Sequence, residues 1–238
     1  MKNVLVITLN SHEGDFMKCV EVIHAQRGVS IEHHIISDRS EIDAHVMLVK
    51  TWNALKHRFD GMVKVDADTV ITKDDAIATV FDIMERNDAS SAQVRLHDYY
   101  TNSMINGLNF FTQGSTFEEP SDVLFCDRCV THKKLVHSDQ GLFPEHSPIG
   151  VHCFYSTQKQ AYHFGVHRGL KNRHEEMELV RRAMADDGDT IDSVRAFVIA
   201  GYEDREKFRQ GGFNYIDYLF KSEFMKAHKL LEDKRKKI

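Results

Sequence analysis

Two aspartates one residue apart, Asp66 and Asp68, are the strongest chemical signal in the sequence. They follow the apolar run 62–65, whose length and composition predict a short buried strand. Two like charges at the end of a buried strand cost free energy unless a cation lies between them. Carboxylate oxygens suit Mg²⁺ or Mn²⁺, and these ions also bind substrate diphosphates. The pair therefore predicts a divalent-cation site, although a helix-capping aspartate beside a solvated one would have the same spacing.

The segments around this pair alternate between strand and helix patterns. Strands are predicted at 4–9, 31–36 and 62–65, and helices within 16–28, 46–59 and 72–84. Short links between alternating strands and helices imply right-handed crossovers and a parallel sheet. We therefore expect the first 90 residues to form a doubly wound α/β unit.

Polar residues also stand where the first two strands end. Thr8 and Asn10 close the first strand, and Asp38 follows the second. In an open α/β sheet, ligands collect at the carboxyl ends of the strands. These three residues are therefore expected to bind a ligand at the same edge as Asp66 and Asp68.

The pattern changes after Ser91. Residues 93–111 alternate weakly and predict added or antiparallel strands, whereas 112–150 contain all three prolines and are expected to be loop-rich. Helical patterns return at 158 and continue to an aromatic amphipathic helix at 215–231. The chain is therefore expected to be a Rossmann-type α/β sheet flanked by helices, divided at 1–90, 91–171 and 172–238, with the last part a helical extension.

Composition excludes several classes of protein. A net charge of −5 and 42% hydrophobic residues are ordinary for a soluble globular chain and argue against a general polyanion binder. No apolar run is long enough to cross a membrane, and four cysteines do not make a disulfide framework, so the cytoplasm is the expected compartment. The tail 221–238 holds seven basic and three acidic residues. It is expected to be a solvated helix, with peripheral membrane or polyanion contact as the alternative.

Cysteine spacing raises a separate possibility. Cys126 and Cys129 have the CxxC spacing of a zinc or redox pair, but the sequence has no second such pair. Cys153 and neighbouring histidines could complete a zinc site only if the fold happened to bring them together.

Four segments together resemble the GT-A glycosyltransferases, especially the family 2-like group with its small bacterial and phage members. They are VLVITLN at 4–10, IISD at 35–38, KVDAD at 64–68, and residues 150–171, which begin GVH. The resemblance is good over 1–87, patchy over 88–150 and moderate over 150–171. It implies a GT-A-like fold with an acceptor region in the loop-rich part, and a nucleotide-sugar donor whose diphosphate is bridged by Mn²⁺ or Mg²⁺.

The resemblance also implies roles for the strand-end residues. The first strand binds the nucleotide, and Asp38 contacts its base or ribose. Asp68 touches the metal directly, while Asp66 contacts the ribose or binds the metal through water. In the family, a histidine from the C-terminal half completes the coordination of the metal. The resemblance assigns this role to His152, with His163 and His167 as alternatives.

Other groups would act on the acceptor and the diphosphate. An inverting transferase needs a general base, and Asp127 is the best match, although Cys126 stands where the family has an acidic partner. Glu118, Glu119, Asp122 and Asp139 are alternatives. Arg168 and Lys171 could face the diphosphate or form a solvated helix face. Lys64 could pair with Asp66 or with a phosphate.

The expected function is transfer of a sugar from a nucleotide sugar to an acceptor hydroxyl, on a glycan or on a hydroxymethylated base in DNA. A sugar nucleotidyltransferase is the second possibility, but such enzymes need a glycine-rich phosphate loop, and residues 10–15 contain one glycine. A non-catalytic nucleotide or metal binder on the same fold is the third.

Overall fold

The computed structural model describes residues 1–118, 130–131, 133–137, 148–209 and 217–237. The chain forms two compact units. The sheet unit consists of Met1–His97 and Met104–Phe154, and the helical unit consists of Asp98–Ser103 and Tyr155–Ile238. The predicted general base Asp127 and its alternatives Glu119, Asp122 and Asp139 lie outside the described residues, as do Cys126 and Cys129.

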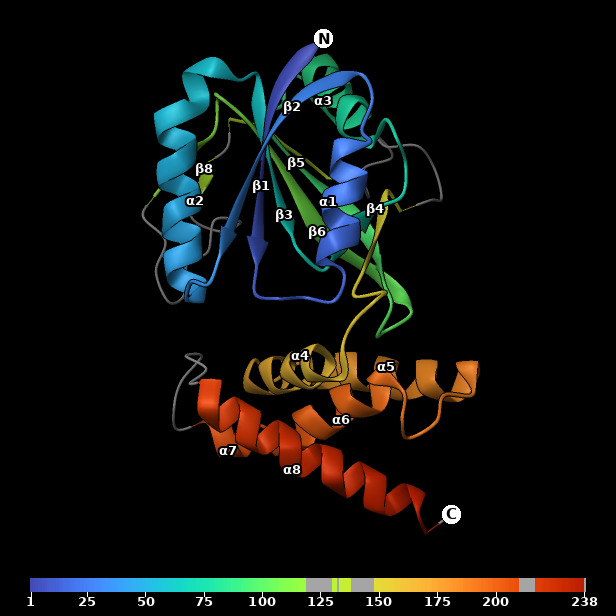
Figure 1. Ribbon diagram of the computed structural model, residues 1–238. Helices are drawn as coiled ribbons and strands as arrows, with labels where there is room; N and C mark the ends of the chain where they lie inside the picture. Colours follow the sequence, from blue (N-terminus) through green and yellow to red (C-terminus); the bar gives the residue numbers. More distant parts are fainter. Residues whose placement is uncertain (119–129, 132, 138–147, 210–216, 238) are drawn as a thin grey trace. The chain divides into compact units, whose positions relative to one another are not determined.

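The order of elements along the chain follows the predicted alternation, and Figure 1 shows their arrangement within each unit. The strands are β1 Lys2–Asn10, β2 Val29–Ser37, β3 Gly61–Asp66, β4 Thr69–Ile71, β5 Ser91–Asp98, β6 Ser103–Thr112, β7 Thr116–Phe117, β8 Val130–Thr131, β9 Leu135–His137 and β10 Gly150–His152. The helices are α1 Phe16–His24, α2 Glu41–Leu55, the 3₁₀ turn η1 Lys56–Arg58, α3 Ala76–Arg86, α4 Gln158–Leu170, α5 His174–Asp187, α6 Val194–Asp204, α7 Glu206–Arg209 and α8 Asp217–Arg235.

The main sheet is mixed. Its strand order is β2-β1-β3-β6-β5-β10-β4, with β9 paired to β5. The first three strands are parallel, as predicted, and β6 is antiparallel to β3. This confirms the α/β prediction and the antiparallel strands expected after Ser91. The short strand β4, antiparallel to β10, was not predicted, because the sequence pattern indicated a helix soon after Asp68.

Alternating side chains of β1 build two cores, one on each face of the sheet. Val4 and Val6 pack with buried residues of α1 and α3, whereas Leu5 and Ile7 pack with α2, including Trp52. Figure 1 shows α2 on one side of the sheet and α1 and α3 on the other. Burial on both faces explains why β1 and β3 read as continuous apolar runs. The two layers of helices fix the carboxyl ends of β1 and β3.

The helical unit depends on a close crossing of α4 and α6. A Cβ added at Gly165 would lie 1.9 Å from the carbonyl oxygen of Val198, and one added at Gly201 would lie 2.0 Å from that of Tyr162. Both contacts are with backbone, which cannot swing aside as a side chain can. Only glycine therefore allows the two helices to approach this closely.

Gly165→Ala is expected to destabilise the protein by about 1–3 kcal/mol or more, because the added methyl group forces α4 and α6 apart. Urea unfolding followed by circular dichroism measures the change. Gly169→Ala on the same helix is the matched control. The three atoms nearest to its Cβ would all belong to the side chain of Arg205, at 2.5–3.2 Å, and none to backbone, so a smaller loss is expected. Equal losses for the two variants would contradict the backbone clash.

Candidate metal and nucleotide site

Backbone pairing brings the Asp-x-Asp segment against the strand that carries His152. Asp66 is the last residue of β3, and Asp68 immediately precedes β4. The antiparallel register pairs His152 with Thr69. One step further along, the amide of Cys153 donates a 2.8 Å hydrogen bond to the carbonyl oxygen of Asp68. Residues 85 positions apart are thus fixed side by side by main-chain bonds.

Three potential metal ligands meet at this point. Asp68, His152 and Cys153 each offer one ligand atom, all within 4.8 Å of one another. His152 Nε2 lies 3.3 Å from Asp68 Oδ2. The other carboxylate oxygen, Asp68 Oδ1, is buried and finds no hydrogen-bond partner among the described residues. A buried carboxylate oxygen without a partner is costly, and a cation would satisfy it. The donor set therefore fits a divalent metal.

The first aspartate makes a different contact. Asp66 Oδ2 accepts a 2.6 Å hydrogen bond from Lys64 Nζ, the lysine being almost fully buried and the aspartate side chain 41% exposed. Of the two partners considered for Lys64, the structure shows the carboxylate. Asp66 is not one of the three clustered ligands, so its predicted roles toward the ribose or the metal stay predictions.

The electrostatics around Asp68 favour its charged form. Burial opposes its ionisation, but the charge and hydrogen bond of His152, with contributions from Cys153 and Lys64, more than offset burial and hold the pKa of Asp68 below its usual value. Nearby Glu13 behaves oppositely. Burial, together with the negative charges of Asp68 and Asp66, raises the pKa of Glu13 to about 7. The region thus concentrates negative charge that a cation would relieve.

Glu13→Gln is expected to remove a pH-dependent loss of stability. Because the folded-state pKa of Glu13 lies above its unfolded value, wild-type stability should fall as the pH rises from about 4.5 to about 7. At pH 8, in the presence of a chelator, we expect the variant to exceed wild type by about 1–3 kcal/mol, and at pH 4.5 to match it. Urea unfolding across this range tests the prediction. Glu21→Gln, which removes an exposed carboxylate from α1, is the matched control and should retain the fall in stability attributed to Glu13.

The loops after β1 and β2 form a second polar group. Asn10 Nδ2 donates to Ser37 Oγ at 3.0 Å, and His12 Nε2 lies 2.7 Å from Asp38 Oδ1. His12 and Asp38 both have positive φ, 67° and 58°. Left-handed conformations of residues other than glycine are uncommon and cluster at functional sites. His12 connects the two predicted residues, because its amide donates to Asn10 Oδ1 and its ring contacts Asp38.

The remaining predicted site residues have other surroundings. Thr8 is fully buried, and its hydroxyl is 2.8 Å from His33 Nε2. Arg168 Nε lies 3.0 Å from Glu176 Oε2, and its guanidinium lies over the ring of Phe164. Lys171 follows the last residue of α4. The predicted contacts of these three residues with a nucleotide or diphosphate stay predictions.

The rival histidines lie on α4 in the helical unit. His163 and His167 stack with ring centroids 6.3 Å apart, and burial lowers the pKa of His167 well below its usual value. Their four-residue spacing does place both on one helix face, as expected. Among the three candidates for the histidine ligand, His152 is the one in the described cluster with Asp68. Of the alternatives for the general base, Glu118 is described; it is exposed and follows β7.

The sequence analysis missed Glu13 and His12 as site residues, and it considered Cys153 only as a possible zinc ligand together with Cys126 and Cys129. Cys153 stands directly after a proposed ligand, but only the pairing of β10 with β4 shows that it faces Asp68. Glu13 and His12 belong to the loop between β1 and α1, which is the position where nucleotide-binding α/β proteins place ligand-contacting residues. That position was the available signal.

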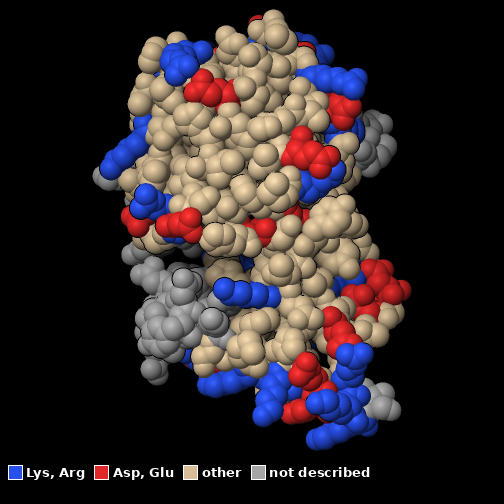
Figure 2. Space-filling model, viewed as in Figure 1, with Lys and Arg blue, Asp and Glu red and all other residues tan. Residues whose placement is uncertain are grey.

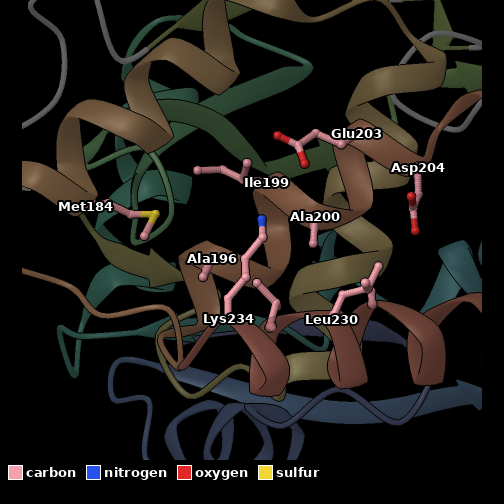
Figure 3. A pocket seen from close by; sticks show the side chains of 10 residues that line it. Met184, Ala196, Ile199, Ala200, Glu203, Asp204, Leu230 and Lys234 are labelled. Carbon is pink, nitrogen blue, oxygen red and sulfur yellow. The ribbon is translucent and has the colours of Figure 1, made fainter. Parts of the chain in front are cut away.

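Among the described residues, two hollows lie away from the metal cluster; one, of about 360 Å³, is on the sheet unit beside Asn3, Glu32, Arg58 and Phe59, and the other is in the helical unit. The second hollow, of about 190 Å³ between α5, α6 and α8, is lined by Met184, Ala196, Ile199 and Leu230, with Glu203, Asp204 and Lys234 also at its wall (Figure 3). It is smaller than the roughly 300 Å³ typical of ligand pockets. On the face shown in Figure 2, basic and acidic side chains are interspersed over the sheet unit, and basic side chains gather toward the end of α8.

Comparisons with known proteins find no matching family model and no significantly similar curated sequence. Two solved structures share some of the shape. A197 from STIV aligns at 12% identity and a TM-score of 0.36 over 48% of this chain and 65% of that chain, so the match spans less than two thirds of its length. The mannosyltransferase PcManGT from Pyrobaculum calidifontis, solved with GDP-Man and Mn²⁺, aligns at 10% identity and a TM-score of 0.42, over 94% of this chain and 85% of that one.

Both TM-scores are too low to establish a shared fold, so the class rests on the chain's own topology. That class is a mixed α/β protein with a candidate cation site beside the carboxyl ends of its parallel strands. In the part of the chain that the structure describes, no helix has the length and apolar character needed to cross a bilayer.

Proposed function

We propose that this protein is a metal-dependent glycosyltransferase that moves a sugar from a nucleotide-sugar donor to an acceptor hydroxyl. The observation that carries the proposal is the pairing of Asp68 with His152 just beyond the end of β3, next to the Asp66–Lys64 pair. It is supported by the sequence resemblance to GT-A enzymes, whose Asp-x-Asp segment corresponds to 66–68.

Each group of side chains has a defined task in this proposal. Asp68 and His152 would hold Mn²⁺ or Mg²⁺, and a metal there would supply Lewis-acid neutralisation of the charge on the leaving diphosphate. Asn10, His12 and Asp38 line the neighbouring strand ends and would orient the nucleotide. Lys64 holds Asp66 at the end of β3, where the partly exposed carboxylate would accept a hydrogen bond from a ribose hydroxyl.

The acceptor side of the reaction depends on residues outside the described part of the chain. Asp127 is proposed as the general base that takes the acceptor proton in an inverting transfer. The acceptor is a glycan or a hydroxymethylated base in DNA, and the basic tail at 221–238 would assist an anionic acceptor. A sugar nucleotidyltransferase is the second candidate; it would consume a nucleoside triphosphate and release pyrophosphate instead.

The direct test is a screen of nucleoside diphosphates by thermal shift, with and without Mn²⁺. At a ligand concentration one hundred times Kd, binding stabilises the folded state by about 2.7 kcal/mol. We expect one nucleotide to stand out, and only with metal. Its sugar conjugates are then tested for metal-dependent release of nucleoside diphosphate. If no nucleotide stabilises the protein in the presence of Mn²⁺, the proposal fails. Binding without turnover of any sugar conjugate would favour a non-catalytic binder.

A further inference from the structure

Cys153 is held in an unusual backbone conformation beside Asp68. Its φ is 59°, in the left-handed region that costs a residue with a side chain about 1–3 kcal/mol. The residue is 1% exposed, and its amide is tied to the carbonyl of Asp68. Its Sγ lies 3.5 Å from Asp68 Oδ2 and 3.4 Å from His152 Nε2. The strained backbone thus directs a buried thiol at the two proposed metal ligands.

The three ligand atoms form a nearly equilateral triangle with sides of 3.3, 3.4 and 3.5 Å. Zinc binds sulfur at about 2.3 Å, and imidazole nitrogen and carboxylate oxygen at about 2.0–2.2 Å. Tetrahedral angles between bonds of those lengths place the ligand atoms about 3.3–3.6 Å apart. The triangle therefore has the size of one face of a tetrahedral site. The fourth position would stay open to water or a substrate oxygen.

Charge supports the same arrangement. One aspartate and one thiolate would balance a divalent cation, with neutral His152 as the third ligand. Asp68 Oδ1, buried and without a described hydrogen bond, is available as an additional contact. Cys19 is also buried nearby, but it lies outside the cluster: its Sγ approaches the carbonyl oxygen of Asp66, at 3.9 Å.

The geometry points to Cys153 as a direct thiolate ligand of the metal, so that the site selects borderline, thiophilic divalent cations such as Zn²⁺ or Co²⁺ over Mg²⁺. This inference rests on the cation site of the proposed function and narrows its choice of ion. Thiolate is a soft ligand that favours zinc-like ions, whereas Mg²⁺ requires octahedral oxygen coordination.

Co²⁺ tests the ligation without any measure of turnover. Titration of the full-length protein is expected to produce the near-ultraviolet charge-transfer absorption of a cobalt–thiolate bond. Cys153→Ser should abolish this band. The same variant should bind Co²⁺ at least about 10-fold more weakly. Loss of a residue that only hydrogen-bonds to a metal ligand already reduces metal affinity roughly 10–100-fold. Mg²⁺ affinity should change little. Cys153→Gly provides a second variant that glycine's tolerance of positive φ keeps folded.

The other cysteines supply the controls. Cys19→Ala and the double variant Cys126→Ser/Cys129→Ser should both retain the band. The inference is overturned if wild type binds Co²⁺, as measured by equilibrium dialysis, without a thiolate band. It is also overturned if the band survives in Cys153→Ser, or if no metal binds. A thiolate band without turnover of any nucleotide sugar would reject only the proposed function. Metal-dependent turnover without the band would reject only the role of Cys153.

Discussion

Replacement of Asp68 by asparagine is expected to reduce metal-dependent release of nucleoside diphosphate about 10³-fold or more. Asparagine keeps the shape of the side chain but removes the negative charge that would hold the cation beside His152. Without the cation, charge on the leaving diphosphate is not neutralised, and electrostatic stabilisation of this kind is worth several kcal/mol. Initial-rate measurements with the best nucleotide sugar, at saturating Mn²⁺, test the prediction.

Stability measurements distinguish loss of metal from loss of fold. The amide of Cys153 bonds to the backbone carbonyl of Asp68, which asparagine retains, so Asp68→Asn should still fold in the presence of a chelator. Its unfolding midpoint should lie somewhat below that of wild type, because the favourable interactions of the carboxylate with His152 and Lys64 are lost. Added metal should stabilise wild type but not the variant. Asp82→Asn, an exposed aspartate on α3, should keep full activity. Unchanged turnover in Asp68→Asn would refute the metal assignment.

Arg195→Ala is expected to cost about 3 kcal/mol of folding stability, and up to about 5 kcal/mol. Arg195 is 2% exposed and satisfies groups from two distant segments of the helical unit. Its Nη1 donates to Asp187 and Asp189 at 2.6 and 2.9 Å, while Nε and Nη2 donate to the carbonyl of Tyr99 at 3.1 and 2.6 Å. Alanine would leave these acceptors without their donor and open a cavity. Urea unfolding measures the loss.

Two further substitutions check the reason for this cost. Arg195→Lys keeps the positive charge but lacks the planar guanidinium that donates to the carboxylates and the carbonyl at the same time. Most of the loss of folding stability should therefore remain. Arg181→Ala removes an exposed ion pair with Glu178 on α5 and should change stability by less than about 0.5 kcal/mol. A loss below about 1 kcal/mol in Arg195→Ala would show that the network contributes little.

The α/β character of this protein follows from local sequence patterns. The apolar runs of β1 and β3 are buried on both faces of the sheet, and β2 lies beside β1. Such apolar runs can be recognised in the sequence without knowledge of the strands that pair with them. The position of Asp66 and Asp68 at a strand end follows from the same pattern. The mixed part of the sheet does not, because β6 could have joined either edge, and pairing partners are set by contacts distant in sequence.

The sequence and the tertiary structure each determined part of the chemistry of the candidate site. The sequence by itself determined the two aspartates, their place after a buried strand and a histidine candidate at 152, since residue type and strand length are local properties. Only the tertiary structure decided that β10 pairs with β4, which sets Cys153 opposite Asp68 and leaves Asp66 paired with Lys64. A ligand set drawn from segments 85 positions apart exists only once the backbone has joined them, so no local pattern could reveal it.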